Sequence, residues 1–162
     1  MSRVDLSQAL TPSILDRLMD PESSGTAARG GYGIEQIIYS VRRDLEELLN
    51  THRSIINLPQ EFPEIVTSPV GYGIPDFGSL GTSTVKQRDS IGRMVEEIIA
   101  RFEPRLRGVK VHVIDDNRGT DHHLNVRFQI EASLRVEPYP DISFETVMEL
   151  TTGCTEIRTL KG

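Results

Sequence analysis

Hydrophobic residues recur every three or four positions in two segments of the chain, which is the spacing of one face of an α-helix. In residues 34–50 they are Ile34, Ile37, Ile38, Val41, Leu45, Leu48 and Leu49. In residues 89–102 they are Ile91, Met94, Val95, Ile98, Ile99 and Phe102. Pro104 ends the second segment, because proline disfavours the helical conformation of the residue before it. The pattern predicts two amphipathic helices.

The C-terminal part of the chain instead alternates hydrophobic and polar residues, which is typical of strands with one buried face. The alternation covers residues 109–113 and 124–134, and further strands are predicted at 142–150 and, as a short edge strand, at 155–160. Turn-forming residues at 115–121 predict that the first two strands form an antiparallel hairpin. Helices followed by strands indicate an α+β fold, with two main helices packed on a three- to four-stranded antiparallel sheet.

Two segments fall outside this pattern. Residues 1–33 hold one short apolar cluster and a glycine-rich run, so we interpret them as an N-terminal arm and linker that precedes a domain at 34–162. Residues 51–83 contain four prolines and are predicted to form a long ordered loop.

Composition narrows the possible partners. A chain of 162 residues fits one domain, and its formal charge of −6 disfavours binding to the phosphate backbone of nucleic acids. Cys154 is the only cysteine, which excludes an intrachain disulfide and agrees with a reducing compartment. No apolar stretch approaches the roughly 20 residues that cross a bilayer, and the first residues do not read as a signal peptide. We expect a cytoplasmic protein without direct membrane insertion.

Two clusters contain residue types found in ligand sites, but each has a simpler interpretation. The glycine-rich residues 30–33 precede a helix, where free amides bind phosphate, yet they follow no predicted strand and lack the lysine of phosphate-binding loops. His122 and His123 lie beside the acidic residues 115–121, yet adjacent strand residues point to opposite faces and no calcium-loop pattern is present. A linker and a hairpin turn are favoured, so we expect no cofactor and no metal.

The remaining candidates for catalysis are carboxylates and the single cysteine. Glycoside hydrolysis needs an acid with a raised pKa and a second carboxylate about 5 to 9 Å away across a cleft. Glu96 and Glu97 are instead neighbours on the polar flank of a helix, near Glu103. Nothing marks Cys154 as an activated nucleophile. The sequence therefore predicts a protein that is not an enzyme.

The segment Glu103-Pro104-Arg105 differs from these candidates. Proline predicts an extended exit from the helix, in which Glu103 and Arg105 project to the same side with opposite charges. Two interpretations stay open from the residues alone. The pair is either a solvent-exposed ion pair at a helix terminus, worth at most about 1 kcal/mol, or an anchor for another subunit through the planar fork of arginine.

Four segments in order carry a resemblance to a known family. They are SILDRL at 13–18, SVRRDLEELLNT at 40–51, YGIPDF at 72–77 and RFEPRL at 101–106. Together they resemble the TssE family of type VI secretion baseplate subunits and related phage-tail baseplate wedge proteins, over roughly residues 13 to 153. Where a more basic pair is expected after residue 51, this chain has His52 and Arg53.

The resemblance implies a structural wedge subunit of a contractile injection system, assembled near the inner membrane of a bacterium. It implies partners, TssF and TssG, and places the family's Glu-Pro-Arg motif on Glu103, Pro104 and Arg105, which hold the subunit to its neighbours. It also implies a docking surface for sheath subunits, for which an edge strand of the sheet is suited. Arg105→Ala is then expected to leave a folded monomer that no longer co-purifies with TssF and TssG.

Two alternatives remain at this point. The wider family has carried a lysozyme-like label, so a peptidoglycan-cleaving hydrolase is one alternative, although no acid and nucleophile pair supports it. A regulatory adaptor that shares the fold and binds a single soluble partner is the other. Peptidoglycan cleavage would identify the first, and flanking genes would identify the second.

Overall fold

The computed structural model describes residues 18, 33–53, 61–75, 85–114, 125–149 and 152–160. The chain forms two compact units, Met1–Val41 and Arg42–Gly162. Their boundary falls inside helix α2 (Ile34–Asn50), so the second unit begins with the C-terminal half of that helix. Most of the predicted arm lies outside the described residues, and the predicted domain boundary at residue 34 stays a prediction.

Both predicted helices are present. Helix α2 begins after Gly33, whose carbonyl accepts the N–H groups of Gln36 at 3.0 Å and Ile37 at 3.2 Å. Helix α4 (Val85–Phe102) begins four residues before the predicted start at 89, because its first turn contains good helix formers but no hydrophobic repeat. The helix ends where Pro104 predicts, at Phe102.

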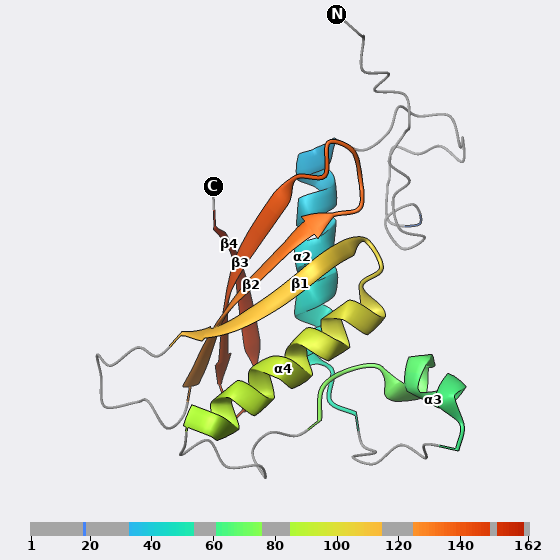
Figure 1. Cartoon of the computed structure of the whole chain (residues 1–162), viewed down its shortest axis with the longest axis vertical. Coiled ribbons are helices and arrows are strands. Elements are labelled where there is room, and N and C mark those ends of the chain that lie inside the picture. The colour runs from blue at the N-terminus through green and yellow to red at the C-terminus, as the bar shows by residue number, and fades with distance from the viewer. Residues whose placement is uncertain are drawn as a thin grey trace, which may run out of the picture. The chain divides into compact units, whose positions relative to one another are not determined.

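Four antiparallel strands form one sheet in the order β1-β2-β3-β4 (Figure 1). Their bounds are β1 Leu106–Ile114, β2 Asn125–Leu134, β3 Asp141–Glu149 and β4 Thr155–Leu160. The predicted strands, including the short edge strand at 155–160, are confirmed. Strands β1 and β2 pair as the hairpin prediction requires, while the predicted turn at 115–121 lies outside the described residues.

A β-bulge interrupts β1 near its start. The pairing register with β2 shifts between Arg107 and Lys110, and Gly108 has a φ of +62°. A glycine in the left-handed conformation is the usual first residue of such a bulge, because it has no Cβ to clash. The bulge explains why the predicted alternation only starts at Val109.

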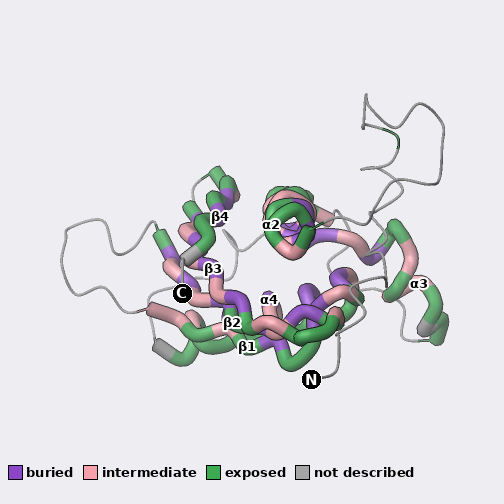
Figure 2. The backbone as a smooth tube through the Cα atoms, turned by 90° about the horizontal axis from the view of Figure 1, so that it is seen from above, coloured by how far each residue is buried: buried purple, intermediate pink, exposed green. Residues whose placement is uncertain are grey.

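The helices and the sheet share one hydrophobic core. Helix α4 and the part of α2 from residue 42 onward pack against one face of the sheet, which confirms the predicted α+β fold. At Gly92 the helix lies so close to β1 that a Cβ would come within 3.1 Å of Cγ2 of Val113. Figure 2 colours the buried residues purple; in the second unit they include Leu45, Leu49, Val95, Ile99, Phe128, Ile130, Phe144 and Ile157.

The predicted loop at 51–83 contains two short helical segments that the pattern did not predict. They are α3 (Pro63–Thr67) and the 3-10 helix η1 (Pro69–Gly71). Each has a proline in its first turn, where the missing N–H costs nothing, and Ser68 Oγ accepts the N–H of Val70 at 3.2 Å. They are too short for a hydrophobic period to appear in the sequence.

None of the described helices is long and apolar enough to cross a membrane.

Candidate functional site

Three segments that are far apart in the sequence meet around Glu103-Pro104-Arg105. The ring of Tyr72 packs edge-on against the ring of Phe102, with 5.3 Å between their centroids. From helix α2, Asp44 reaches Arg105. We call this group the motif corner, and it consists of Asp44, Tyr72, Phe102, Glu103, Pro104 and Arg105. Its members come from three of the four segments that carry the family resemblance.

The corner begins as a tight turn at the end of α4. The N–H of Glu103 still donates to the carbonyl of Ile99 at 2.9 Å, and the carbonyl of Glu103 accepts the N–H of Leu106 at 3.2 Å. The sequence predicted an extended exit here, and that prediction is wrong, because residues 104 and 105 form a turn before β1 starts. Pro104 lies at the exposed apex of this turn.

The turn brings Glu103 and Arg105 together. Nε of Arg105 donates to Oε1 of Glu103 at 2.7 Å, and Nη2 of Arg105 donates to Oε2 of the same carboxylate. The N–H of Arg105 also donates to Oε1 of Glu103, at 3.1 Å. The prediction that the two charged side chains lie close together is therefore confirmed, although a turn and not an extended segment brings them together. Glu103 is only 4% exposed, so this is not the solvent-exposed ion pair of the simpler interpretation.

Asp44 is the third member of the ion network. Its Oδ2 accepts a hydrogen bond from Nη2 of Arg105 at 2.6 Å, and its Oδ1 accepts one from Nη2 of Arg43 at 2.7 Å. Arg105 thus links α2 to the end of α4 across 61 positions of sequence. The sequence pattern assigns no role to Asp44. Its only indication is that it lies in segment 40–51, which carries part of the family resemblance.

Two residues of the motif corner, Arg105 and Tyr72, have shifted pKa values. Burial alone would lower the pKa of Arg105, but the hydrogen bonds and charges of Glu103 and Asp44 outweigh it and raise the pKa. Burial is also the main cause of a raised pKa at Tyr72, with contributions from the negative charges of Glu47, Asp44 and Glu103. Arg105 is therefore permanently charged, and the Tyr72 hydroxyl remains protonated at neutral pH.

A second feature lies directly beside the corner. The N–H of Arg135 donates to the carbonyl of Arg105 at 2.8 Å, and Nε of Arg135 donates to the carbonyl of Leu106 at 3.1 Å. In the same connection between β2 and β3, the ring of Tyr139 lies 4.2 Å below the guanidinium carbon of Arg107. Nothing in the sequence signalled this pair, because its members are 32 positions apart and belong to no hydrophobic period.

Glu96 and Glu97, the other carboxylates considered for hydrolysis, lie on helix α4. Oε1 of Glu96 accepts a hydrogen bond from Nζ of Lys110 at 3.0 Å, and its Oε2 accepts the N–H of Val111 at 3.1 Å. The Lys110 hydrogen bond is the main cause of a lowered pKa at Glu96. A general acid for hydrolysis needs the opposite shift. Glu97 lies on the exposed face of α4.

The residues considered as candidate metal and phosphate sites lie largely outside the described residues. This holds for His122, His123, the acidic residues 115–121 and residues 30–32. In the part of the chain that the structure describes, no group of three or more His, Cys, Asp or Glu residues is arranged to hold a metal ion. Gly33 and Gln36 use their polar groups at the start of α2, where Gly33 N–H donates to Gln36 Oε1 at 2.9 Å.

The chain is similar to a known protein family and to solved structures. A family model described as baseplate wedge protein gp25 matches residues 35–139, which is well over half of the chain and includes the whole motif corner. A solved structure described as "The baseplate complex from the type VI secretion system" contains a chain that superposes with a TM-score of 0.51 at 15% identity. That match covers 79% of this chain and 97% of the other, and at this identity it shows a shared fold. No curated protein matches the sequence.

Proposed function

Because the chain belongs to the gp25 family of baseplate wedge proteins, we propose that it is a structural wedge subunit of a type VI secretion baseplate. The observation that carries this proposal is the family match, which extends from α2 to the connection between β2 and β3. The shared fold with a chain of a type VI baseplate complex supports the choice of system. The subunit acts by assembly near the bacterial inner membrane, without chemistry of its own.

The partners in this proposal are TssF and TssG, which the motif corner binds. The ion network supports this role, because it holds the turn at Glu103-Pro104-Arg105 in one conformation before a partner arrives. A surface that is already ordered loses less conformational entropy on binding. Arg105 acts mainly by shaping the corner, since Glu103 and Asp44 already occupy donors of its fork.

Sheath subunits are the second class of partner, and a sheet edge is the surface that suits them. Helix α4 lies beside β1, and Glu96 already accepts the N–H of Val111 on that strand. In the described residues, side chains of α2 hydrogen-bond only the first part of the β4 edge, at Thr155 and Ile157. The Asn50 amide bonds both main-chain groups of Thr155, and Arg42 donates to the carbonyl of Ile157 at 3.2 Å.

By the alternation of an antiparallel ladder, the main-chain groups of Thr159 face the same way as those of Thr155 and Ile157. Thr159 is exposed, and no side chain among the described residues hydrogen-bonds its main-chain groups. The end of β4 near Thr159 is therefore the part of the sheet edge best suited to accept a strand from a sheath subunit.

Substitution of Arg105 tests the role of the corner. Arg105→Ala is expected to abolish co-purification with TssF and TssG and to lower the melting temperature, because it leaves Glu103 buried without its main partner. The double variant E103Q/R105Q removes both charges and therefore avoids that uncompensated carboxylate. Arg101→Ala, an exposed arginine in the last turn of α4, is the matched control and should bind normally.

Circular dichroism establishes which variants are folded before binding is compared. Full co-purification by folded R105A and by folded E103Q/R105Q would contradict a role of the corner in partner binding. If R101A also lost binding, the assay would respond to the loss of any positive charge in this region and not specifically to the motif corner.

The hydrolase alternative predicts a different result. It requires peptidoglycan cleavage that is lost on substitution of Glu96, Glu97 or Glu103. The lowered pKa of Glu96 and the burial of Glu103 against Arg105 both argue against an acid at these positions. We expect no release of soluble fragments from purified peptidoglycan by the wild-type protein.

A further inference from the structure

Arg107 combines exposure with a fixed orientation. It lies two residues after Arg105 at the start of β1, and its guanidinium carbon is 4.2 Å from the centroid of the Tyr139 ring. Stacking on an aromatic face holds an arginine in place while its N–H groups remain available at the edge of the plane. In the part of the chain that the structure describes, no carboxylate forms an ion pair with Arg107. Arg107 is therefore a positioned cation whose guanidinium donors are not used by any carboxylate of the described residues.

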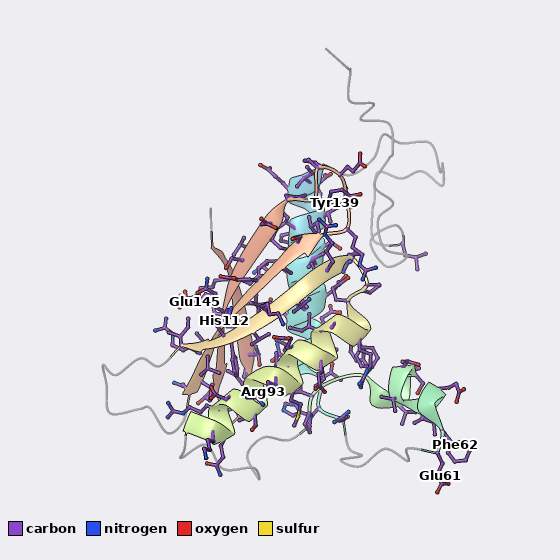
Figure 3. All side chains as sticks on the ribbon, in the orientation of Figure 1. Glu61, Phe62, Arg93, His112, Tyr139 and Glu145 are labelled. Atoms are coloured by element: carbon purple, nitrogen blue, oxygen red, sulfur yellow. The ribbon has the colours of Figure 1, made fainter. Side chains whose placement is uncertain are left out.

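Tyr139 is held in an uncommon conformation. Its φ is 58°, in the left-handed region that residues other than glycine, asparagine and aspartate seldom adopt, and the residue is 42% exposed. Neither its ring nor its hydroxyl is needed to fill the core. Strained residues persist where surrounding structure holds them, and they concentrate at binding and catalytic sites. Figure 3 shows Tyr139 on the connection between β2 and β3.

The surface beside this pair is open and continuous with the motif corner. A Cβ built on Gly108 would meet no atom within 4 Å, so a partner has access to the main chain next to Arg107. Arg135, from the same connection as Tyr139, donates hydrogen bonds to the carbonyls of Arg105 and Leu106. Hydrogen bonds therefore connect the turn at Pro104 to the segment that carries Tyr139.

We propose that Arg107, stacked on Tyr139, anchors an aspartate or glutamate side chain of a neighbouring baseplate subunit. This inference rests on the proposed function and adds residues and a partner chemistry to it. Arg105 already binds two carboxylates of its own chain, whereas Arg107 presents a planar fork that matches a carboxylate from outside. Arginine and tyrosine are also the residues most enriched among those that dominate binding energy at interfaces.

The test measures binding of purified variants to the purified TssF–TssG complex of the same organism. Arg107→Gln should weaken binding by about tenfold or more, the loss typical of an interface anchor. Arg107→Lys should also bind more weakly, because lysine keeps the charge but lacks the fork. Tyr139→Ser, which removes the stacking surface, should have a smaller effect of the same sign.

Arg93→Gln is the matched control, since Arg93 is an exposed arginine of α4 (Figure 3) and lies outside the proposed surface. It should bind like the wild type, and all variants should keep the wild-type melting temperature within a few degrees. Wild-type affinity of Arg107→Gln or Arg107→Lys would overturn the inference and leave the proposed function intact. Absence of binding by the wild-type protein would overturn the proposed function, and this inference with it.

Discussion

The guanidinium of Arg105 shows how one residue connects sequence and structure. The sequence identified Glu103 and Arg105 as neighbours of opposite charge, and the structure confirms that their side chains are paired. It could not show that Asp44 completes the network, because that contact spans 61 positions and depends on how α2 packs. The same limit applies to the stacking of Arg107 on Tyr139. Contacts between residues close in sequence can be predicted from the sequence. The contact of Arg105 with Asp44 depends on the tertiary structure.

A second residue, Thr146, allows a test of core energetics. It is fully buried in β3, and its hydroxyl has no hydrogen-bond partner in the described residues. Thr146→Val replaces that hydroxyl by a methyl group of similar size and removes the cost of burying an unsatisfied polar atom. We expect the free energy of unfolding in urea to rise by about 1 kcal/mol.

Thr155→Val serves as the control for this prediction. The Thr155 side chain is also buried, but its hydroxyl donates to the carbonyl of Leu49 at 3.5 Å. The control should not stabilise the protein. A decrease in stability for Thr146→Val would contradict the prediction.

At the scale of elements, the long amphipathic segments were predictable and the short ones were not. Helices α2 and α4 and the strands carry enough repeats for a period to appear. Helices α3 and η1 do not. Side chains that cover the sheet edges were also beyond prediction: Asn50 bonds the N–H and carbonyl of Thr155 as a neighbouring strand would, at 2.8 and 2.9 Å, from 105 positions away.

The edge of β1 makes a prediction about pH. Because the pKa of Glu96 is lowered in the folded state, its charge stabilises the fold above the ordinary pKa of glutamate, and this contribution is lost as pH falls through the lowered value. Between about pH 6 and pH 3, the melting temperature of the Glu96→Gln variant should therefore fall less than that of the wild type.

Glu97→Gln is the matched control for the pH experiment, because no described residue hydrogen-bonds the neighbouring Glu97 carboxylate. It should follow the wild-type curve. An identical acid-induced decrease for Glu96→Gln and the wild type would mean that the contacts of Glu96 with Lys110 and Val111 contribute nothing measurable.

At the scale of the whole molecule, the fold class followed from the order of helical and alternating patterns, and the family followed from four short segments. Neither the fold class nor the family predicted which residues of these segments come into contact. Tyr72 contacts Phe102, and Asp44 contacts Arg105, only because the tertiary structure brings these distant positions to the end of α4. This convergence gives a physical reason for the resemblance, since residues that build one surface must be compatible with one another.

The central claim, that this protein is a structural subunit required to assemble a secretion baseplate, is tested most directly in the cell. Fluorescently labelled sheath subunits are imaged in a strain that lacks this gene and in the same strain complemented with the wild-type gene. The account predicts that extended sheaths are nearly absent from the deletion strain and return on complementation. Sheaths that assemble at the wild-type frequency in the deletion strain would contradict it.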